Sequence, residues 1–178
     1  MVITIREEED KDYSAIEDLV YRAFKTAEHA DRDEHNLVSR LRNSNAYIKE
    51  LSLVSELDGK ILGYIMTSKL YIKCNDKEVL SSAIAPVAVD PDLQKSGVGS
   101  KMIRVTLEIA KELGYKSIFV LGSEKYYPKF GFIESAKFGI NPPFVVPSVN
   151  FMALELEQNS LNSVKGEVVY AKEFFEQE

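Results

Sequence analysis

Residues 90–100 constrain the fold of this chain more than any other stretch. They join an apolar run that ends at Val89 to a strongly helical segment that begins near Gly97. A helix leaves its first four N–H groups without internal partners, and its dipole adds about half a positive charge there. Glycines at positions 97 and 99 let the backbone approach a ligand where a Cβ would intrude. The order of strand, glycine-bearing turn and helix therefore predicts an anion-binding turn in an α/β domain.

The composition is that of an ordinary globular protein and narrows the possible classes of protein further. Of the 178 residues, 45% are hydrophobic and 28% charged, which suits a single domain over residues 1–178. The net charge of −6 argues against nucleic-acid binding. Cys74 is the only cysteine, which excludes an intrachain disulfide, and no metal site is expected. Without a signal peptide or an apolar run of about 20 residues, we expect a cytoplasmic protein that does not contact membranes.

Hydrophobic periodicity predicts a mixture of strands and helices. Helices are expected over residues 12–24, 34–41 and 97–113, a helical turn at 126–130, and strands at 3–5, 51–57, 61–72, 82–89, 117–121, 151–156 and 167–170. Asp58-Gly59 predicts a hairpin, Gly114 a helix C-cap, and Pro86 a bulge or a locally splayed pairing. The strand–helix–strand order around residues 82–121 makes those two strands parallel. The charged run at residues 6–10 is expected to be a solvated connection.

Two common phosphate-binding motifs do not fit the turn. A Walker A loop requires Gly-x-x-x-x-Gly-Lys-Ser/Thr, but Gln94 stands five residues before Gly99, and Ser100 precedes Lys101. A Rossmann fingerprint requires a third small residue in the helix and an acidic residue at the end of the next strand. The chain has Met102 in the helix, and its next strand ends in Leu-Gly-Ser. The turn therefore matches neither motif. A nucleotide-binding fold remains an alternative, which nucleotide binding would test.

The turn resembles instead the acetyl-CoA motif of the GNAT acyltransferase superfamily, Gln/Arg-x-x-Gly-x-Gly/Ala. It reads Gln94-Lys95-Ser96-Gly97-Val98-Gly99, after Val89-Asp90-Pro91 in the place of the superfamily's Val-x-Pro. A second segment resembles the Tyr-x-x-x-Gly-Phe signature that follows the next strand, and it reads Tyr127-Pro128-Lys129-Phe130-Gly131-Phe132. More narrowly, residues 52–54, 121–122, 126–132 and 151–156 resemble the YhbS-like branch. The resemblance extends from residue 5 to about residue 174.

This resemblance implies the GNAT fold, an α/β fold whose mixed central sheet contains a splayed parallel strand pair flanked by helices. It implies transfer of an acetyl group from the co-substrate acetyl-CoA to a primary amine by direct attack. The backbone N–H groups that would hold the pyrophosphate are those of Gln94, Lys95, Ser96, Gly97, Val98, Gly99 and Ser100. The pantetheine arm would pair with Val87, Ala88 and Val89, and one of these N–H groups would polarise the thioester carbonyl.

The resemblance also suggests catalytic residues. Tyr127 occupies the position of the usual general acid, and a packed aromatic residue is the less favoured alternative. Glu34 or His35 could remove the proton from the attacking amine, directly or through water, and Glu124 is a further candidate. Where the superfamily often carries an Asn that touches the pantetheine, this chain has Gly-Ser-Glu, so Ser123 or backbone groups would replace it.

The sequence does not identify the acceptor. It could be an amine-bearing small molecule or a protein amine, and the donor could carry an acyl group longer than acetyl. A non-catalytic module that binds acyl-CoA or regulates through it is the alternative function. The superfamily often dimerises through its last strands, which allows a homodimer, but the sequence does not decide the oligomeric state.

Overall fold

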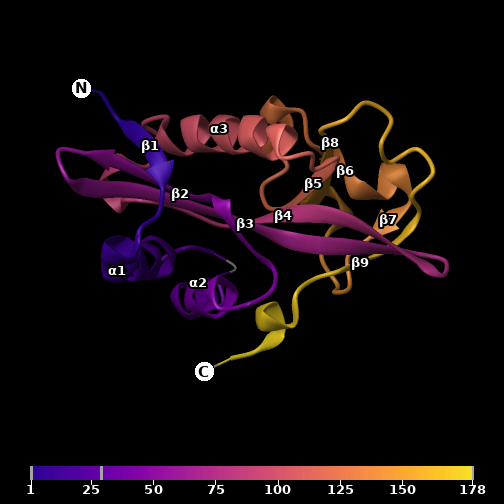
Figure 1. Cartoon of the computed structure of the whole chain (residues 1–178), viewed down its shortest axis with the longest axis horizontal. Coiled ribbons are helices and arrows are strands. Elements are labelled where there is room, and N and C mark those ends of the chain that lie inside the picture. The colour runs from indigo at the N-terminus through magenta and orange to yellow at the C-terminus, as the bar shows by residue number, and fades with distance from the viewer. Residues whose placement is uncertain (1, 29, 178) are drawn as a thin grey trace. The chain divides into compact units, whose positions relative to one another are not determined.

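The computed structural model describes residues 2–28 and 30–177, and these fall into two compact units. Residues 2–28, 30–68, 85–109 and 172–177 form the first unit, and residues 69–84 and 110–171 form the second. Strands β3 (Lys60–Cys74) and β4 (Lys77–Val89) and helix α3 (Val98–Glu112) each continue from one unit into the other. Figure 1 shows the path of the chain.

The first unit is built on antiparallel strands whose central segments are buried. Strand β1 (Thr4–Glu7) pairs with β2 (Tyr47–Leu57), and β2 pairs with the first part of β3. Helices α1 (Tyr13–Phe24) and α2 (Glu34–Arg42) lie on one face of these strands and α3 on the other (Figure 1). The α3 contact is close, because a Cβ at Gly63 would meet Met102 at 2.8 Å. Strands covered on both faces carry nearly continuous apolar runs, as residues 51–54 and 62–66 do.

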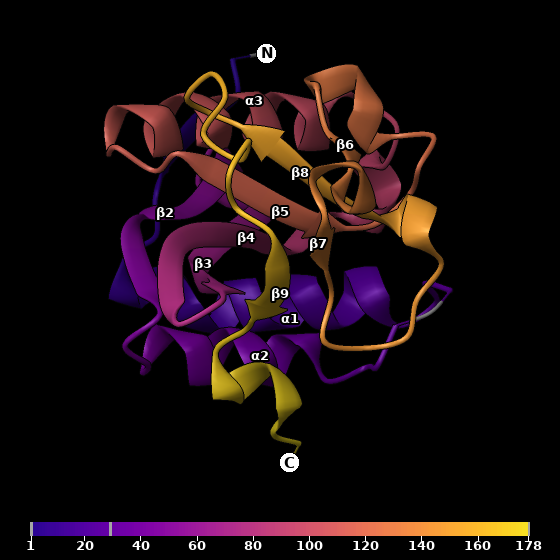
Figure 2. The same cartoon turned by 90° about the vertical axis from the view of Figure 1, so that its right-hand side faces the viewer.

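The second unit has its own core. Strand β5 (Ser117–Leu121) pairs in parallel with β4 through Ala83↔Phe119 and Ile84↔Val120, and antiparallel with β8 (Phe151–Glu155). Strands β6 (Ile133–Glu134), β7 (Ile140–Asn141) and β9 (Gly166–Val169) complete the pairings in this unit, with β6 on β8, β7 on β9 and β9 on the end of β3 (Figure 2). Phe119 and Phe151 stack at 5.6 Å in its core.

The main elements agree with the sequence predictions, including the parallel strand pair. Asp58 and Gly59 have φ of 50° and 79°, as a two-residue hairpin turn requires, and Gly114 ends α3 with φ of 89°. Strands β2 and β4 begin four and five residues earlier than predicted, because polar side chains interrupt the apolar pattern there. A second hairpin turn around Asn75, with φ of 55°, was not predicted.

Candidate active site

The predicted anion-binding turn begins at a buried aspartate in the first unit. Asp90 is 3% exposed, and its backbone N–H donates to the Leu62 carbonyl at 2.8 Å. Its side chain accepts from the Asp92 N–H at 3.1 Å and lies 3.5 Å from the Arg22 guanidinium and 3.6 Å from the Lys60 amine. Burial works against the charged form, but this hydrogen bond and the two cations hold the pKa of Asp90 below its ordinary value. Asp90 therefore anchors the end of β4 to the start of the turn.

The turn itself has the backbone that the glycine spacing predicts. The short 3-10 helix η2 (Pro91–Leu93) leads into Lys95 and Gly97, whose φ values are 65° and 95°. A Cβ at Gly97 would meet nothing within 4 Å, so the backbone borders open space there. Helix α3 starts at the next residue, and the Lys101 N–H donates to the Gly97 carbonyl at 3.0 Å. The turn thus presents the N-terminus of a 15-residue helix to an open surface, which favours an anion.

The strand residues predicted to meet the pantetheine arm lie in the same unit. Val87 and Val89 are half-buried, whereas Ala88 between them is 2% exposed. This alternation leaves one face of the strand end partly accessible, next to the turn. Pro86, which has no N–H to donate, precedes them.

Tyr127 lies in the second unit at the start of the 3-10 helix η3 (Tyr127–Phe130). Its ring makes edge-on contacts with Tyr126 at 5.1 Å and with Phe132 at 5.8 Å. Burial, and to a smaller extent Tyr126, raises the pKa of Tyr127 above its ordinary value. The phenol therefore stays protonated at neutral pH and can donate its proton.

Gly122 makes room for the Tyr127 ring. A Cβ at Gly122 would lie 2.3 Å from the Tyr127 ring, so no side chain fits there while the ring keeps its place. Asn150 holds this turn in place, since its Nδ2 donates to the Gly122 carbonyl at 3.0 Å and to the Glu124 carboxylate at 2.8 Å. Sequence reasoning missed Asn150, because nothing in the order of the chain links it to residue 122.

Ser123 has a structural part in this turn. Its carbonyl accepts from the N–H groups of Tyr126 and Tyr127, and its hydroxyl accepts from the Lys125 N–H at 3.2 Å. The neighbouring Lys129 amine lies 4.0 Å from the centre of the Tyr126 ring, which is a cation–π contact.

The three candidate bases differ in the partners that their side chains already have. One carboxylate oxygen of Glu34 accepts from the Asp31 N–H at 2.9 Å, and the other is buried and has no hydrogen-bond partner among the described residues. His35 packs edge-on against Tyr21 at 5.3 Å. Glu124 is exposed and is held by its own backbone N–H and by Asn150, which lower its pKa. Glu34 is therefore the candidate with an oxygen left to bind a proton donor.

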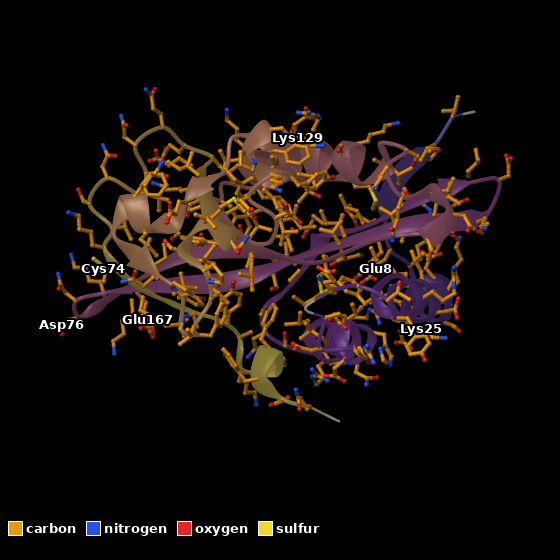
Figure 3. All side chains as sticks on the ribbon, turned by 180° about the vertical axis from the view of Figure 1, so that it is seen from behind. Glu8, Lys25, Cys74, Asp76, Lys129 and Glu167 are labelled. Atoms are coloured by element: carbon orange, nitrogen blue, oxygen red, sulfur yellow. The ribbon has the colours of Figure 1, made fainter. Side chains whose placement is uncertain are left out.

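A buried ionic cluster supports the helix that carries Glu34, and here the sequence prediction was wrong. Residues 6–10 were expected to be solvated, but the Glu8 side chain is fully buried beneath the strands (Figure 3). Its carboxylate accepts from Arg42 at 2.9 and 3.2 Å and from the Tyr47 hydroxyl at 2.7 Å. The Arg42 guanidinium also lies 3.6 Å from the centre of the Tyr13 ring. Glu8 thereby fixes the end of α2, and the charge pattern alone could not show this.

The predicted site residues divide between the two units. The turn, the β4 end, Glu34 and His35 belong to the first unit, and Ser123, Glu124 and Tyr127 belong to the second. Within the residues described, no group of three His, Cys, Asp or Glu side chains could hold a metal ion. In the same part of the chain, no helix combines the length and the apolar character needed to cross a membrane.

Residues 5–132 match the acetyltransferase (GNAT) family, so this chain belongs to the GNAT acetyltransferase family. Within it, the chain is 34% identical over 137 residues to the uncharacterised N-acetyltransferase YjhQ of Escherichia coli K12, covering 76% of this chain and 73% of YjhQ. It is 28% identical over 171 residues to the uncharacterised N-acetyltransferase YhbS of the same strain, covering 96% and 97% of the two chains.

Two solved structures are similar over nearly the whole chain. The Escherichia coli YhbS structure in complex with CoA has a TM-score of 0.87 at 27% identity, covering 98% of this chain and 92% of YhbS. A GNAT family acetyltransferase from Brucella melitensis in complex with acetyl-CoA has a TM-score of 0.80 at 29% identity, covering 97% and 98%. The resemblance to the GNAT family and its YhbS-like branch is thus confirmed, and the fold is the GNAT fold.

Proposed function

We propose that this chain transfers an acetyl group from acetyl-CoA to a primary amine by direct attack. The observation that carries the proposal is the turn before α3, where Gly97 has φ of 95° and borders open space at a helix N-terminus. Such a turn binds a pyrophosphate with backbone N–H groups and needs no basic side chain. The complexes of the two similar proteins with CoA and acetyl-CoA support the same assignment.

The donor would be held by backbone groups of the first unit. The N–H groups of residues 94–100 would bind the pyrophosphate, and the half-exposed strand end at residues 87–89 would pair with the pantetheine arm. A strand-end N–H would also polarise the thioester carbonyl as negative charge develops on its oxygen. Because backbone groups would make these contacts, binding of the donor would depend on the conformation of the turn and not on charged side chains.

Tyr127 would act as the general acid. The amine nitrogen forms a bond to the thioester carbon, the carbon–sulfur bond breaks, and the departing thiolate takes the phenolic proton. The raised pKa of Tyr127 keeps that proton in place until the thiolate forms. The ring contacts with Phe132 and Tyr126 fix the phenol, and Gly122 makes room for it.

Glu34 would accept the proton that the attacking amine loses, directly or through water. Its second oxygen is buried at the start of α2 and has no hydrogen-bond partner among the described residues, so it has no bond to lose when it takes a proton. His35 is the second candidate. Its ring contacts Tyr21 edge-on, and substitution of His35 would test whether a ring nitrogen takes the proton.

Two measurements on the full chain test the proposal. Isothermal titration with acetyl-CoA should show saturable binding, and CoA release should depend on an added primary amine. Binding without CoA release from any amine in a broad panel would favour a non-catalytic acyl-CoA module. Failure to bind acetyl-CoA, together with stabilisation by ATP or NAD, would overturn the assignment of the turn itself.

A further inference from the structure

The Tyr127 ring packs against the main chain at Gly122, the residue that follows the end of β5. An added Cβ at Gly122 would lie 2.3 Å and 2.9 Å from two carbon atoms of this ring, which is too close for any side chain. Well-packed atoms leave no free space between them, so a displacement of one group is passed on to its neighbour. Any movement of the Gly122 backbone therefore changes the surface on which the ring lies.

The peptide after Gly122 also supports the turn that starts η3. The Ser123 carbonyl accepts from the Tyr126 N–H at 3.1 Å and from the Tyr127 N–H at 3.2 Å. Tyr127 is thus held at two points, through its ring by Gly122 and through its N–H by Ser123. The orientation of the peptide group that joins residues 122 and 123 affects both points, and with them the direction in which the phenol points.

Asn150 holds this peptide group from a distant segment of the second unit. The Gly122 N–H donates to the Asn150 carbonyl at 2.9 Å, and the Asn150 Nδ2 donates to the Gly122 carbonyl at 3.0 Å. The same Nδ2 donates to the Glu124 carboxylate at 2.8 Å. Both partners are acceptors, so they fix the amide with its nitrogen toward the turn. A substitution at residue 150 keeps the backbone bond and removes only the bonds of the amide.

The position of Asn150 is set by contacts that do not involve Tyr127. Asn150 is the last residue of the 3-10 helix η5 (Ser148–Asn150), and its N–H donates to the Pro147 carbonyl at 2.9 Å. The next residue, Phe151, is 1% exposed and stacks on Phe119 in the core. A polar side chain that its own element immobilises can orient a catalytic group through hydrogen bonds.

We propose that Asn150 is a positioning residue for Tyr127, and that its amide holds the Gly122 peptide so that the phenol is aimed at the departing thiolate. This inference rests on the acid role proposed for Tyr127. Loss of the amide keeps the phenol and its proton but lets the ring take up other positions, and a misplacement of about 1 Å can cost up to about a hundredfold in rate. Because Asn150 acts only through Tyr127, its loss costs no more than loss of the phenolic hydroxyl.

The test is a double-mutant cycle in the full-length protein. The assay is CoA release at saturating acetyl-CoA, with whichever of spermidine, glycylglycine and 2-phenylethylamine reacts fastest. Asn150→Ala should lower kcat about tenfold and leave KM for acetyl-CoA within about twofold. In the Tyr127→Phe background the same substitution should change kcat by less than about twofold, because the hydroxyl that it orients is already gone. Asn162→Ala removes the same amide from an exposed position in the same unit, so it is the control and should keep kcat unchanged.

The NMR signal of the Tyr127 ring gives a readout that does not depend on turnover. In protein labelled at the tyrosine ring carbons, this signal is identified by its loss in Tyr127→Phe. Asn150→Ala should shift or broaden it, and Asn162→Ala should not. Asn150→Asp gives the same test if the alanine variant does not fold, since it keeps the size of the side chain but sets a carboxylate against the Gly122 carbonyl.

Two results would overturn the inference. One is an unchanged Tyr127 ring signal in both variants of Asn150. The other is an equal loss of kcat from Asn150→Ala in the presence and absence of the Tyr127 hydroxyl, which would leave the acid role standing. If Tyr127→Phe alone keeps its kcat, the acid role fails, and the ring signal still decides whether Asn150 positions Tyr127.

Discussion

Replacing Tyr127 with phenylalanine removes one hydroxyl and leaves the ring in place. The contacts of the ring with Tyr126, Phe130 and Phe132 and its fit against Gly122 all involve carbon atoms that phenylalanine keeps. We therefore expect the free energy of unfolding to change by less than about 1 kcal/mol. The affinity for acetyl-CoA should also stay within about threefold, since the pyrophosphate turn belongs to the other unit.

The expected loss of rate follows from the pKa of the phenol. A general acid contributes roughly 10²–10⁴-fold. Burial raises the pKa of Tyr127 above 10, whereas a thiol has a reference pKa near 8.5, so proton transfer from the phenol to the thiolate is uphill. The contribution should therefore lie at the low end, and we expect kcat for Tyr127→Phe to fall about a hundredfold, equivalent to about 2.7 kcal/mol.

The assay is amine-dependent thiol release at saturating acetyl-CoA, with the dissociation constant of acetyl-CoA measured separately by calorimetry. Tyr126→Phe is the matched control, because it removes a hydroxyl from the adjacent ring, and its kcat should stay near that of the unchanged protein. A kcat for Tyr127→Phe within twofold of the unchanged protein would refute the acid assignment. Equal losses of kcat and of acetyl-CoA affinity would show that Tyr127 is a packing residue.

Three further changes test the first unit. Arg42→Met should lower the unfolding free energy in urea by about 3–5 kcal/mol, since it leaves the Glu8 carboxylate buried without its cation, and the double variant with Glu8→Leu should recover most of the loss. Asp12→Asn should cost about 2 kcal/mol at pH 7. The Arg6 guanidinium lowers the pKa of Asp12, so this stabilisation is present above about pH 4 and is lost as the pH falls through the lowered value; a pH-independent difference in urea would contradict it. Gly97→Ala should weaken acetyl-CoA binding on the order of tenfold in calorimetry, because φ of 95° disfavours a Cβ; unchanged affinity would argue against the turn as the binding site.

The elements that the sequence predicted well are those whose cause is local. The backbone of the turn at residues 94–100 requires glycine at position 97, and the sequence shows that glycine directly. The same holds for the hairpin at Asp58-Gly59 and for the apolar face of α1. Local steric and periodic constraints act over a few residues, so they leave a signature in the order of residues.

The features that the sequence did not predict depend on contacts between distant segments. Glu8 looks like part of a solvated charge run until Arg42, 34 residues away, is placed against it. Asn150 donates to Gly122, 28 residues away, and strands β6 and β7 have only two residues each, too few to give a periodic signal. A single sequence does not show which distant residues contact each other.

The hydrogen bond between Asn150 and Gly122 has a consequence for how this enzyme could diversify. A gene duplicate could exchange the segment from residue 135 to residue 149 while the turn before α3 and its demand for glycine stayed untouched. Asn150 sets the boundary of such an exchange, since replacing it would also disturb Gly122 and the Tyr127 ring. Directed evolution that randomises this segment should therefore stop one residue short of Asn150.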